Sequence, residues 1–198
     1  MKYREDLPDG YMLRWEGNLL RDRKTLLIVN LLSSGLFVLM TAFGVRRMLS
    51  MRPVPVLELG FREYFVWMVI VIIGSILQIL LHAHAHAVFC GWVSRKTCVF
   101  GFRKMYVYAA GGGYFSRETF IAIELLPFIL QALALWFLQL TLQPVFSAAA
   151  FIVQIVNVSG SAREFYTAFM LLLDPKARWV MDEGLVIRAY GKGSEFPV

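Results

Sequence analysis

The chain has 198 residues, of which 58% are hydrophobic and only 17% are charged. Soluble domains usually contain about 25% charged and about 45–50% apolar residues, so this composition excludes an ordinary soluble protein and indicates a membrane protein. The net charge of +6 does not indicate a nucleic-acid partner, because Lys and Arg in membrane proteins cluster at cytoplasmic helix ends. The length suits a single integral membrane domain over residues 1–198.

Residues 1–24 form a polar N-terminal segment that lacks the apolar core of a cleavable signal peptide. We therefore expect the first spanning helix to act as the insertion signal. Within this segment, the alternating residues 11–15 predict a short strand or an interfacial segment. Four apolar runs follow that are long enough to cross a bilayer. They predict helices over about residues 25–44, 64–93, 118–142 and 145–173.

Shorter signals mark the helix ends and the segments between helices. Gly44-Val45-Arg46-Arg47 should end the first helix, and Asp174-Pro175 should end the fourth. Residues 99–108 are rich in aromatic and β-branched side chains, which predict a short hairpin or an irregular segment, followed by a flexible Gly-rich loop. The tail, residues 174–198, should form a small hairpin that turns at Glu183-Gly184. The expected fold is a mainly α membrane protein with about four transmembrane helices, a short β-hairpin after the second helix and a small C-terminal hairpin.

The distribution of Lys and Arg predicts the orientation in the membrane. If both termini lie on one side, the segments on that side carry fifteen Lys and Arg residues and those on the other side carry four. The positive-inside rule then places both termini in the cytoplasm, and the end of the second helix near the cytoplasmic face.

The three histidines of the chain lie together near the end of the second predicted helix, at positions 82, 84 and 86. His82 and His86 are four residues apart and share one helical face, and two imidazoles at that spacing can bind one metal ion. An ionisable residue at membrane depth is costly, so it is a functional candidate. His84 should point away from this face and is expected to be a neighbour rather than a ligand.

A catalytic zinc site usually has three protein ligands and an open position for water. The fourth apolar run offers Asn157, Ser161 and Glu164, whose spacings of four and three place them on one helical face. Glu164 is the best candidate for the third ligand, and Asp174 is the alternative. Asn157 could contact the substrate or a developing oxyanion, or it could simply link helices, as Ser161 could.

Three other residues could take part in chemistry but have simpler explanations. Cys90 and Cys98 could pair or stay free, and we expect them to be small packing residues. Glu124 lies early in the third apolar run, where it could meet Arg117 or a histidine nitrogen. Solvation at a helix end is the expected explanation for Glu124.

The order of several segments resembles that of a known family. The histidine segment His82-x-x-x-His86-Ala87-Val88-Phe89 comes first, and it is followed by Val99-Phe100-Gly101-Phe102, Leu125-Leu126-Pro127-Phe128, Asn157 with residues 159–164, and Asp182-Glu183-Gly184. This order resembles the small bacterial membrane proteins classed as putative zincin peptidases, over residues 7–190. That family is similar to a minimal site-2 protease, which cleaves peptide bonds at a membrane-embedded zinc.

The resemblance implies a zinc ion bound by His82, His86 and a carboxylate from a later helix. Glu164 occupies the position where the family tends to carry aspartate, and either carboxylate can bind zinc. The resemblance also implies a bacterial cytoplasmic membrane and a membrane protein or peptide as substrate. An extended substrate would add as a strand beside residues 99–108.

Ala83 departs from the zinc-peptidase pattern HExxH, because it occupies the position of the general-base glutamate. That glutamate takes a proton from the water and returns it to the leaving amine, which alanine cannot do. We therefore expect this chain to bind zinc but to hydrolyse peptides poorly. It is either a natural pseudoenzyme or a Glu→Ala variant made to trap substrate. The intact remainder of the pattern favours the second explanation.

Two other functions compete with that of a peptidase. A natural pseudoprotease would use the same fold as a membrane-bound regulator or binding protein, without catalysis. A metal-ion transporter or haem protein could also use these histidines, but haem ligands usually come from facing helices. All three histidines here lie on one predicted helix.

Overall fold

The computed structural model describes residues 2–18, 21–50, 55–96, 98–103, 106–110, 112–184 and 186–193. The helices within them are α1 (Arg23–Ser50), η1 (Pro55–Glu58), α2 (Phe61–Ser94), α3 (Arg117–Thr141), α4 (Pro144–Gly160) and α5 (Ala162–Leu173). The strands are β1 (Tyr3–Arg4), β2 (Tyr11–Asn18), β3 (Val99–Arg103), β4 (Tyr106–Ala110), β5 (Tyr114–Ser116), β6 (Trp179–Asp182) and β7 (Val186–Lys192). This mainly helical fold with two hairpins confirms the predicted fold class.

Two compact units divide the chain. The first, here called the sheet unit, consists of Met1–Val29, Ala83–Pro127 and Arg163–Val198. The second, here called the helical unit, consists of Asn30–His82 and Phe128–Ala162. Whether the units act as the single domain expected from the sequence stays a prediction.

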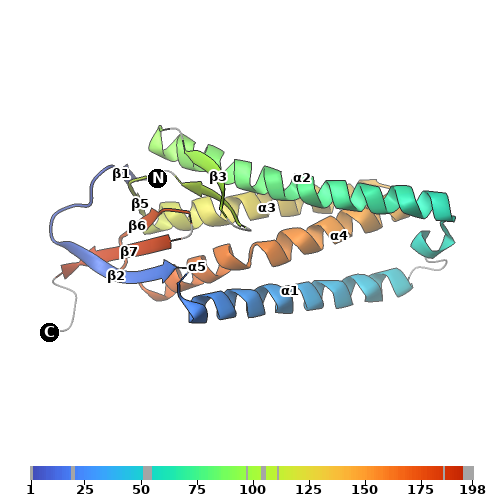
Figure 1. Ribbon diagram of the computed structural model, residues 1–198, viewed down its shortest axis with the longest axis horizontal. Coiled ribbons are helices and arrows are strands. Elements are labelled where there is room, and N and C mark those ends of the chain that lie inside the picture. The colour runs from blue at the N-terminus through green and yellow to red at the C-terminus, as the bar shows by residue number, and fades with distance from the viewer. Residues whose placement is uncertain are drawn as a thin grey trace. The chain divides into compact units, whose positions relative to one another are not determined.

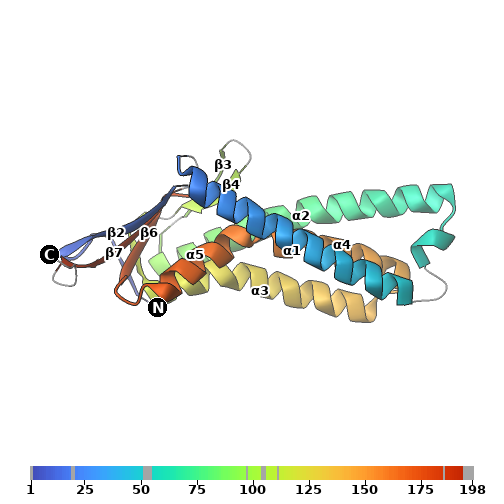
Figure 2. The same ribbon diagram turned by 90° about the horizontal axis from the view of Figure 1, so that it is seen from below.

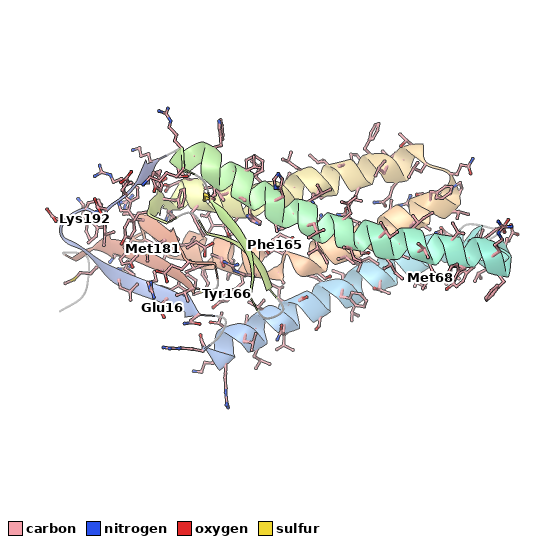
Figure 3. The ribbon with its side chains drawn as sticks, turned by 45° about the horizontal axis from the view of Figure 1, so that its top comes forward. Glu16, Met68, Phe165, Tyr166, Met181 and Lys192 are labelled. Carbon is pink, nitrogen blue, oxygen red and sulfur yellow. A yellow bond between two sulfur atoms is a disulfide. The ribbon has the colours of Figure 1, made fainter. Side chains whose placement is uncertain are left out.

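The sheet unit is built on a five-stranded antiparallel sheet with the order β1-β5-β6-β7-β2. Figure 1 shows β2, β7 and β6 side by side, and the predicted C-terminal hairpin is the β6–β7 pair, in which Asp182 lies opposite Ile187. Glu16 on β2, labelled in Figure 3, accepts a hydrogen bond from Arg188 on β7 at 2.8 Å. Strand β5 was not expected, because Tyr114–Ser116 falls in the stretch predicted to be a loop.

One face of this sheet covers the apolar core of the sheet unit. Phe115 on β5, Val180 on β6 and Ala189 on β7 are buried in one cluster with Phe120 of α3 and Leu171 of α5. Alternate residues of each strand point to the same face, so the short strands supply apolar side chains to one side. The sheet therefore packs against α5 and the start of α3 within this unit.

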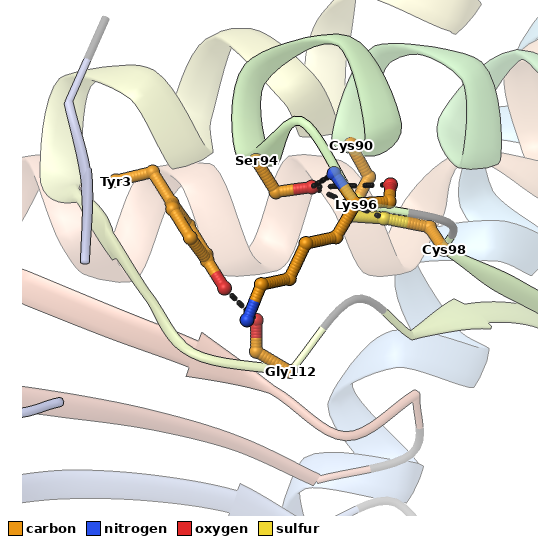
Figure 4. Close-up of a disulfide and its surroundings, with 6 residues drawn as sticks. All are labelled: Tyr3, Cys90, Ser94, Lys96, Cys98 and Gly112. Atoms are coloured by element: carbon orange, nitrogen blue, oxygen red, sulfur yellow. Dashed lines mark hydrogen bonds between the residues drawn. A yellow bond between two sulfur atoms is a disulfide. The ribbon is translucent and has the colours of Figure 1, made fainter. Parts of the chain in front are cut away.

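A second, two-stranded sheet follows α2, as the sequence predicts for residues 99–108. Strands β3 and β4 pair antiparallel. Val99 lies opposite Ala110 at one end of the pair, and Arg103 lies opposite Tyr106 at the other. Cys90 in α2 and Cys98 at the start of this hairpin form a disulfide (Figure 4). The expectation that the cysteines only fill space is therefore wrong, because α2 ends in a tight turn that brings them together. Ser94 stabilises this turn, since its hydroxyl accepts a hydrogen bond from the Lys96 amide at 3.2 Å.

The helical unit contains most of α1, all of α4, the first part of α2 and the later part of α3 (Figure 2). Polar side chains join these apolar helices. The Trp67 indole on α2 donates to the Val145 carbonyl on α4 at 2.9 Å, and the Ser147 hydroxyl donates to the Gln139 carbonyl on α3 at 2.9 Å. Such contacts link helices where hydrophobic burial gives no net attraction between them.

Within the described residues, three helices, α1, α2 and α3, are long and apolar enough to cross a membrane, and there are four such spans if the bent pair α4–α5 counts as one. Only 6–17% of the apolar windows of α1, α2 and α3 is buried inside the protein. Their remaining apolar surface needs an apolar surrounding, which a bilayer supplies. The chain therefore has the features of a membrane protein.

Two helix predictions were wrong in detail. Helix α1 continues through Gly44 and ends at Ser50, because Arg47 in its last turn suits the negative end of the helix dipole. The fourth run is not one helix, since α4 ends at Gly160 and α5 begins at Ala162. Gly160 favours such a break, and the Ser161 hydroxyl, which donates to the Asn157 carbonyl at 2.8 Å, satisfies a backbone group there.

A glycine pair in α1 tests the packing of the helical unit. A Cβ added at Gly44 would collide with the buried ring of Phe151 on α4, whereas a Cβ at Gly35 would meet no atom within 4 Å. We expect Gly44→Ala to lower the free energy of unfolding by about 1–3 kcal/mol through overpacking. Gly35→Ala should be neutral or stabilising by up to about 1 kcal/mol. Thermal unfolding in detergent would compare the two variants, and equal midpoints would contradict this packing.

Candidate metal centre

The candidate centre begins with two histidines on α2. His82 and His86 are both partly buried, and α2 runs without interruption from Phe61 to Ser94. Because residues four apart lie one above the other on a helix, the helix itself fixes the spacing of the two imidazoles. His84 is exposed, as expected for a residue on another side of the helix.

Glu164 in the first turn of α5 supplies a carboxylate to this pair. Its Oε1 lies 3.8 Å from His86 Nε2, and the two side chains are only 13% and 14% exposed. One ligand atom from each of His82, His86 and Glu164 lies within 4.8 Å of the other two. The structure thus brings together the three residues that the sequence singled out as metal ligands.

Two other predicted site residues lie elsewhere. Asp174 accepts a hydrogen bond from Arg14 Nε on β2 at 2.8 Å. Burial opposes ionisation of this carboxyl, but the hydrogen bond and charge of Arg14 hold the Asp174 pKa below its usual value. Asn157 is 1% exposed, and its amide oxygen accepts a hydrogen bond from Gln78 at 2.9 Å. Its expected role toward substrate stays a prediction.

Ala83 is buried, with 6% of its surface exposed. It precedes His86 by three residues, so its methyl group lies on the same side of α2 as the His86 imidazole. In the zinc-peptidase pattern HExxH, this position carries glutamate. A methyl group there can neither accept nor donate a proton.

A largely buried group of charges lies in the sheet unit and interacts electrostatically with Glu164. Arg163 Nη2 donates to both carboxylate oxygens of Asp182, at 3.4 and 3.5 Å. Burial raises the pKa of Asp182, and the Arg163 guanidinium and the Gly184 amide oppose that rise. Glu124 on α3 interacts electrostatically with Arg163, Asp182 and Glu164.

Glu124 is the residue that the sequence reasoning misjudged, because it is 4% exposed rather than solvated. Arg117, its suggested partner, pairs with Glu118 instead. The Glu124 Oε2 atom makes no hydrogen bond within the described residues, and Glu124 lines a cavity of about 20 Å³ together with His86 and Asp182. That volume suffices for about one water molecule. The sequence does contain a signal for Glu124, because a carboxylate inside an apolar run is rare without a function.

The donor set fits a zinc ion. Two imidazoles and one carboxylate are ligands that catalytic zinc takes, with a further position left for water. Glu164 interacts electrostatically with Glu124, Arg163 and Asp182.

A comparison with protein families agrees with this geometry. Residues 75–179, which are more than half of the chain, match the family described as "putative zincin peptidase". The chain belongs to this family. The matched range contains both histidines, Ala83 and Glu164, and the family description makes a metallopeptidase site the natural interpretation of the three converging donors. No curated protein and no solved structure matches the chain.

The choice between Glu164 and Asp174 as third ligand can be tested by zinc binding. We expect Glu164→Ala to weaken zinc affinity by more than the roughly 10–100-fold typical of losing an outer-shell partner, because it removes a direct ligand. Asp174→Asn should leave affinity unchanged, since Asp174 pairs with Arg14. Competition with a chromogenic chelator on the purified protein measures both. Loss of zinc from Asp174→Asn alone would reverse the assignment.

Proposed function

We propose that this chain has the architecture of a site-2-like intramembrane zinc metallopeptidase that acts on a membrane protein or peptide, and that Ala83 leaves it catalytically impaired. The observation that carries the proposal is the convergence of His82, His86 and Glu164. The chain belongs to the zincin peptidase family, and its helices are apolar enough to cross a membrane. The orientation expected from the Lys and Arg distribution, with both termini in the cytoplasm, is part of the proposal.

In this scheme each residue has one task. His82, His86 and Glu164 would hold the metal. Zinc bound there would act as a Lewis acid and lower the pKa of its bound water. A carboxylate at position 83 would take the proton from that water and pass it to the leaving amine. Ala83 can do neither, so substrate would bind without efficient cleavage.

Two features of the structure suit an apolar, extended substrate. A cavity of about 420 Å³ lies in the helical unit between α2, α3 and α4, and its lining is apolar apart from Gln78 and Gln131. Gln131 also contacts His82 at 3.0 Å, so the polar end of this cavity lies beside the proposed metal ligand. Within the described residues the β3–β4 hairpin pairs with no other strand, which leaves an edge to which a substrate strand could add.

Restoring the missing carboxylate tests the enzyme assignment. We expect Ala83→Glu to raise peptide cleavage by about 10²–10⁴-fold over the chain as it stands, the usual contribution of a general base. Ala83→Gln is the matched control, because it has the same size but accepts no proton at neutral pH. Cleavage of a panel of membrane-spanning peptides in proteoliposomes, followed by mass spectrometry, provides the measurement. The double variant Ala83→Glu with His86→Ala should be inactive.

The rival functions predict different results in the same preparation. A membrane-bound regulator would bind zinc and a protein partner, yet Ala83→Glu would produce no cleavage. A transporter would move metal across liposomes, and a haem protein would show an absorption band. A purified protein without zinc, or one whose zinc content does not fall after His82→Ala, would contradict the metal site itself.

A further inference from the structure

A chain of buried amides joins three helices beside His82. Gln78 on α2 is 7% exposed and Asn157 on α4 is 1% exposed, and Gln131 on α3 lies between Gln78 and His82. The Gln78 Nε2 atom donates to Asn157 Oδ1 at 2.9 Å and to Gln131 Oε1 at 3.2 Å. All four residues belong to the helical unit. Polar groups at this depth need partners within the protein, and these amides bond to one another, although Gln78 Oε1 has no hydrogen-bond partner within the described residues.

The hydrogen bonds fix the orientation of the Gln131 amide. Its Nε2 atom donates to the backbone carbonyl of Gln78 at 3.1 Å. A carbonyl oxygen can only accept, so the nitrogen of the Gln131 amide must lie on that side. The Gln131 oxygen therefore lies on the other side, where His82 Nδ1 is 3.0 Å away.

The orientation of Gln131 in turn fixes the tautomer of His82. A carboxamide oxygen has no hydrogen to donate, so His82 Nδ1 must carry the hydrogen of this bond. In the neutral imidazole, the lone pair is then on Nε2. Nε2 is thus the atom that His82 can offer to a metal ion.

We propose that Gln131 is a positioning residue, which holds His82 in the Nδ1–H tautomer with the lone pair on Nε2, the nitrogen that would bind metal, and that Gln78 and Asn157 keep the Gln131 amide in place. The role toward metal rests on the proposed function, whereas the tautomer does not. Asn157 acts in this arrangement through Gln78, two side chains away from His82.

The experiment uses two glutamines of α3 that are both hydrogen-bonded within the helical unit. Gln131→Leu removes the acceptor for His82. Gln139→Leu removes a buried amide eight residues further on, where Gln139 contacts Arg47 at 3.2 Å and no histidine. Gln131→Glu removes the amide nitrogen but keeps an oxygen that can accept the hydrogen bond from His82. A general loss of packing would affect both leucine variants, whereas loss of positioning would affect only Gln131→Leu.

The first readout is the tautomer in metal-free protein. Nitrogen-15 NMR on a background with His84→Gln and His86→Gln leaves His82 as the single histidine. We expect the Nδ1–H form in this background and with Gln139→Leu or Gln131→Glu added. Adding Gln131→Leu should shift the population toward Nε2–H. Retention of the Nδ1–H form with Gln131→Leu would overturn the proposal.

The second readout is zinc affinity with all three histidines present. Gln131→Leu should weaken it about 10–100-fold, as is usual for the loss of an outer-shell partner of a metal ligand. Gln131→Glu and Gln139→Leu should stay within a few-fold of the unmodified chain. Equal zinc affinities for the two leucine variants would contradict positioning of the metal ligand. If the unmodified chain binds no zinc, the proposed function fails, and the tautomer measurement still decides whether Gln131 orients His82.

Discussion

A polar side chain on an apolar helix needs a partner inside the protein, because hydrocarbon cannot hydrogen-bond to it. In the helical unit this requirement decides which helix faces meet. Trp67 and Ser147 find backbone carbonyls on neighbouring helices, and Gln78 finds Asn157. The same contacts that join the helices leave an amide oxygen beside His82. Helix association and ligand orientation are therefore two results of one constraint.

Much of the fold could be predicted because its signals are local. Hydropathy found the spans that α1, α2 and α3 provide, and the spacing of His82 and His86 placed two imidazoles on one face of α2. Glu164 could be proposed as their partner because its spacing from Asn157 and Ser161 placed a carboxylate on a polar face of the fourth run. Side-chain composition found the β3–β4 and β6–β7 hairpins. Each of these inferences needs only residues that are close in sequence.

The remainder depends on contacts between distant segments, which no local pattern records. Strand β5 pairs with β1, which is more than 100 residues earlier in the chain, and three residues at Tyr114–Ser116 are too few to show a periodic pattern. Ser161 was expected to continue a helix but instead lies at a break, so Asn157 and Glu164 do not share one straight face. The burial of Glu124 follows from the packing of β6 and α5 around it, which the sequence does not display. Tertiary contacts of this kind override local propensity.

The disulfide between Cys90 and Cys98 connects the redox state of the surroundings to the structure beside the histidines. Disulfides persist in oxidising compartments and are kept reduced in the cytosol, whereas the positive-inside rule assigns this end of α2 to the cytoplasm. In the cytosol the two residues would be thiols, and the β3–β4 hairpin would lose its covalent attachment to α2. The covalent attachment of the hairpin to α2 therefore depends on the chemistry of the compartment, as well as on the amino-acid sequence.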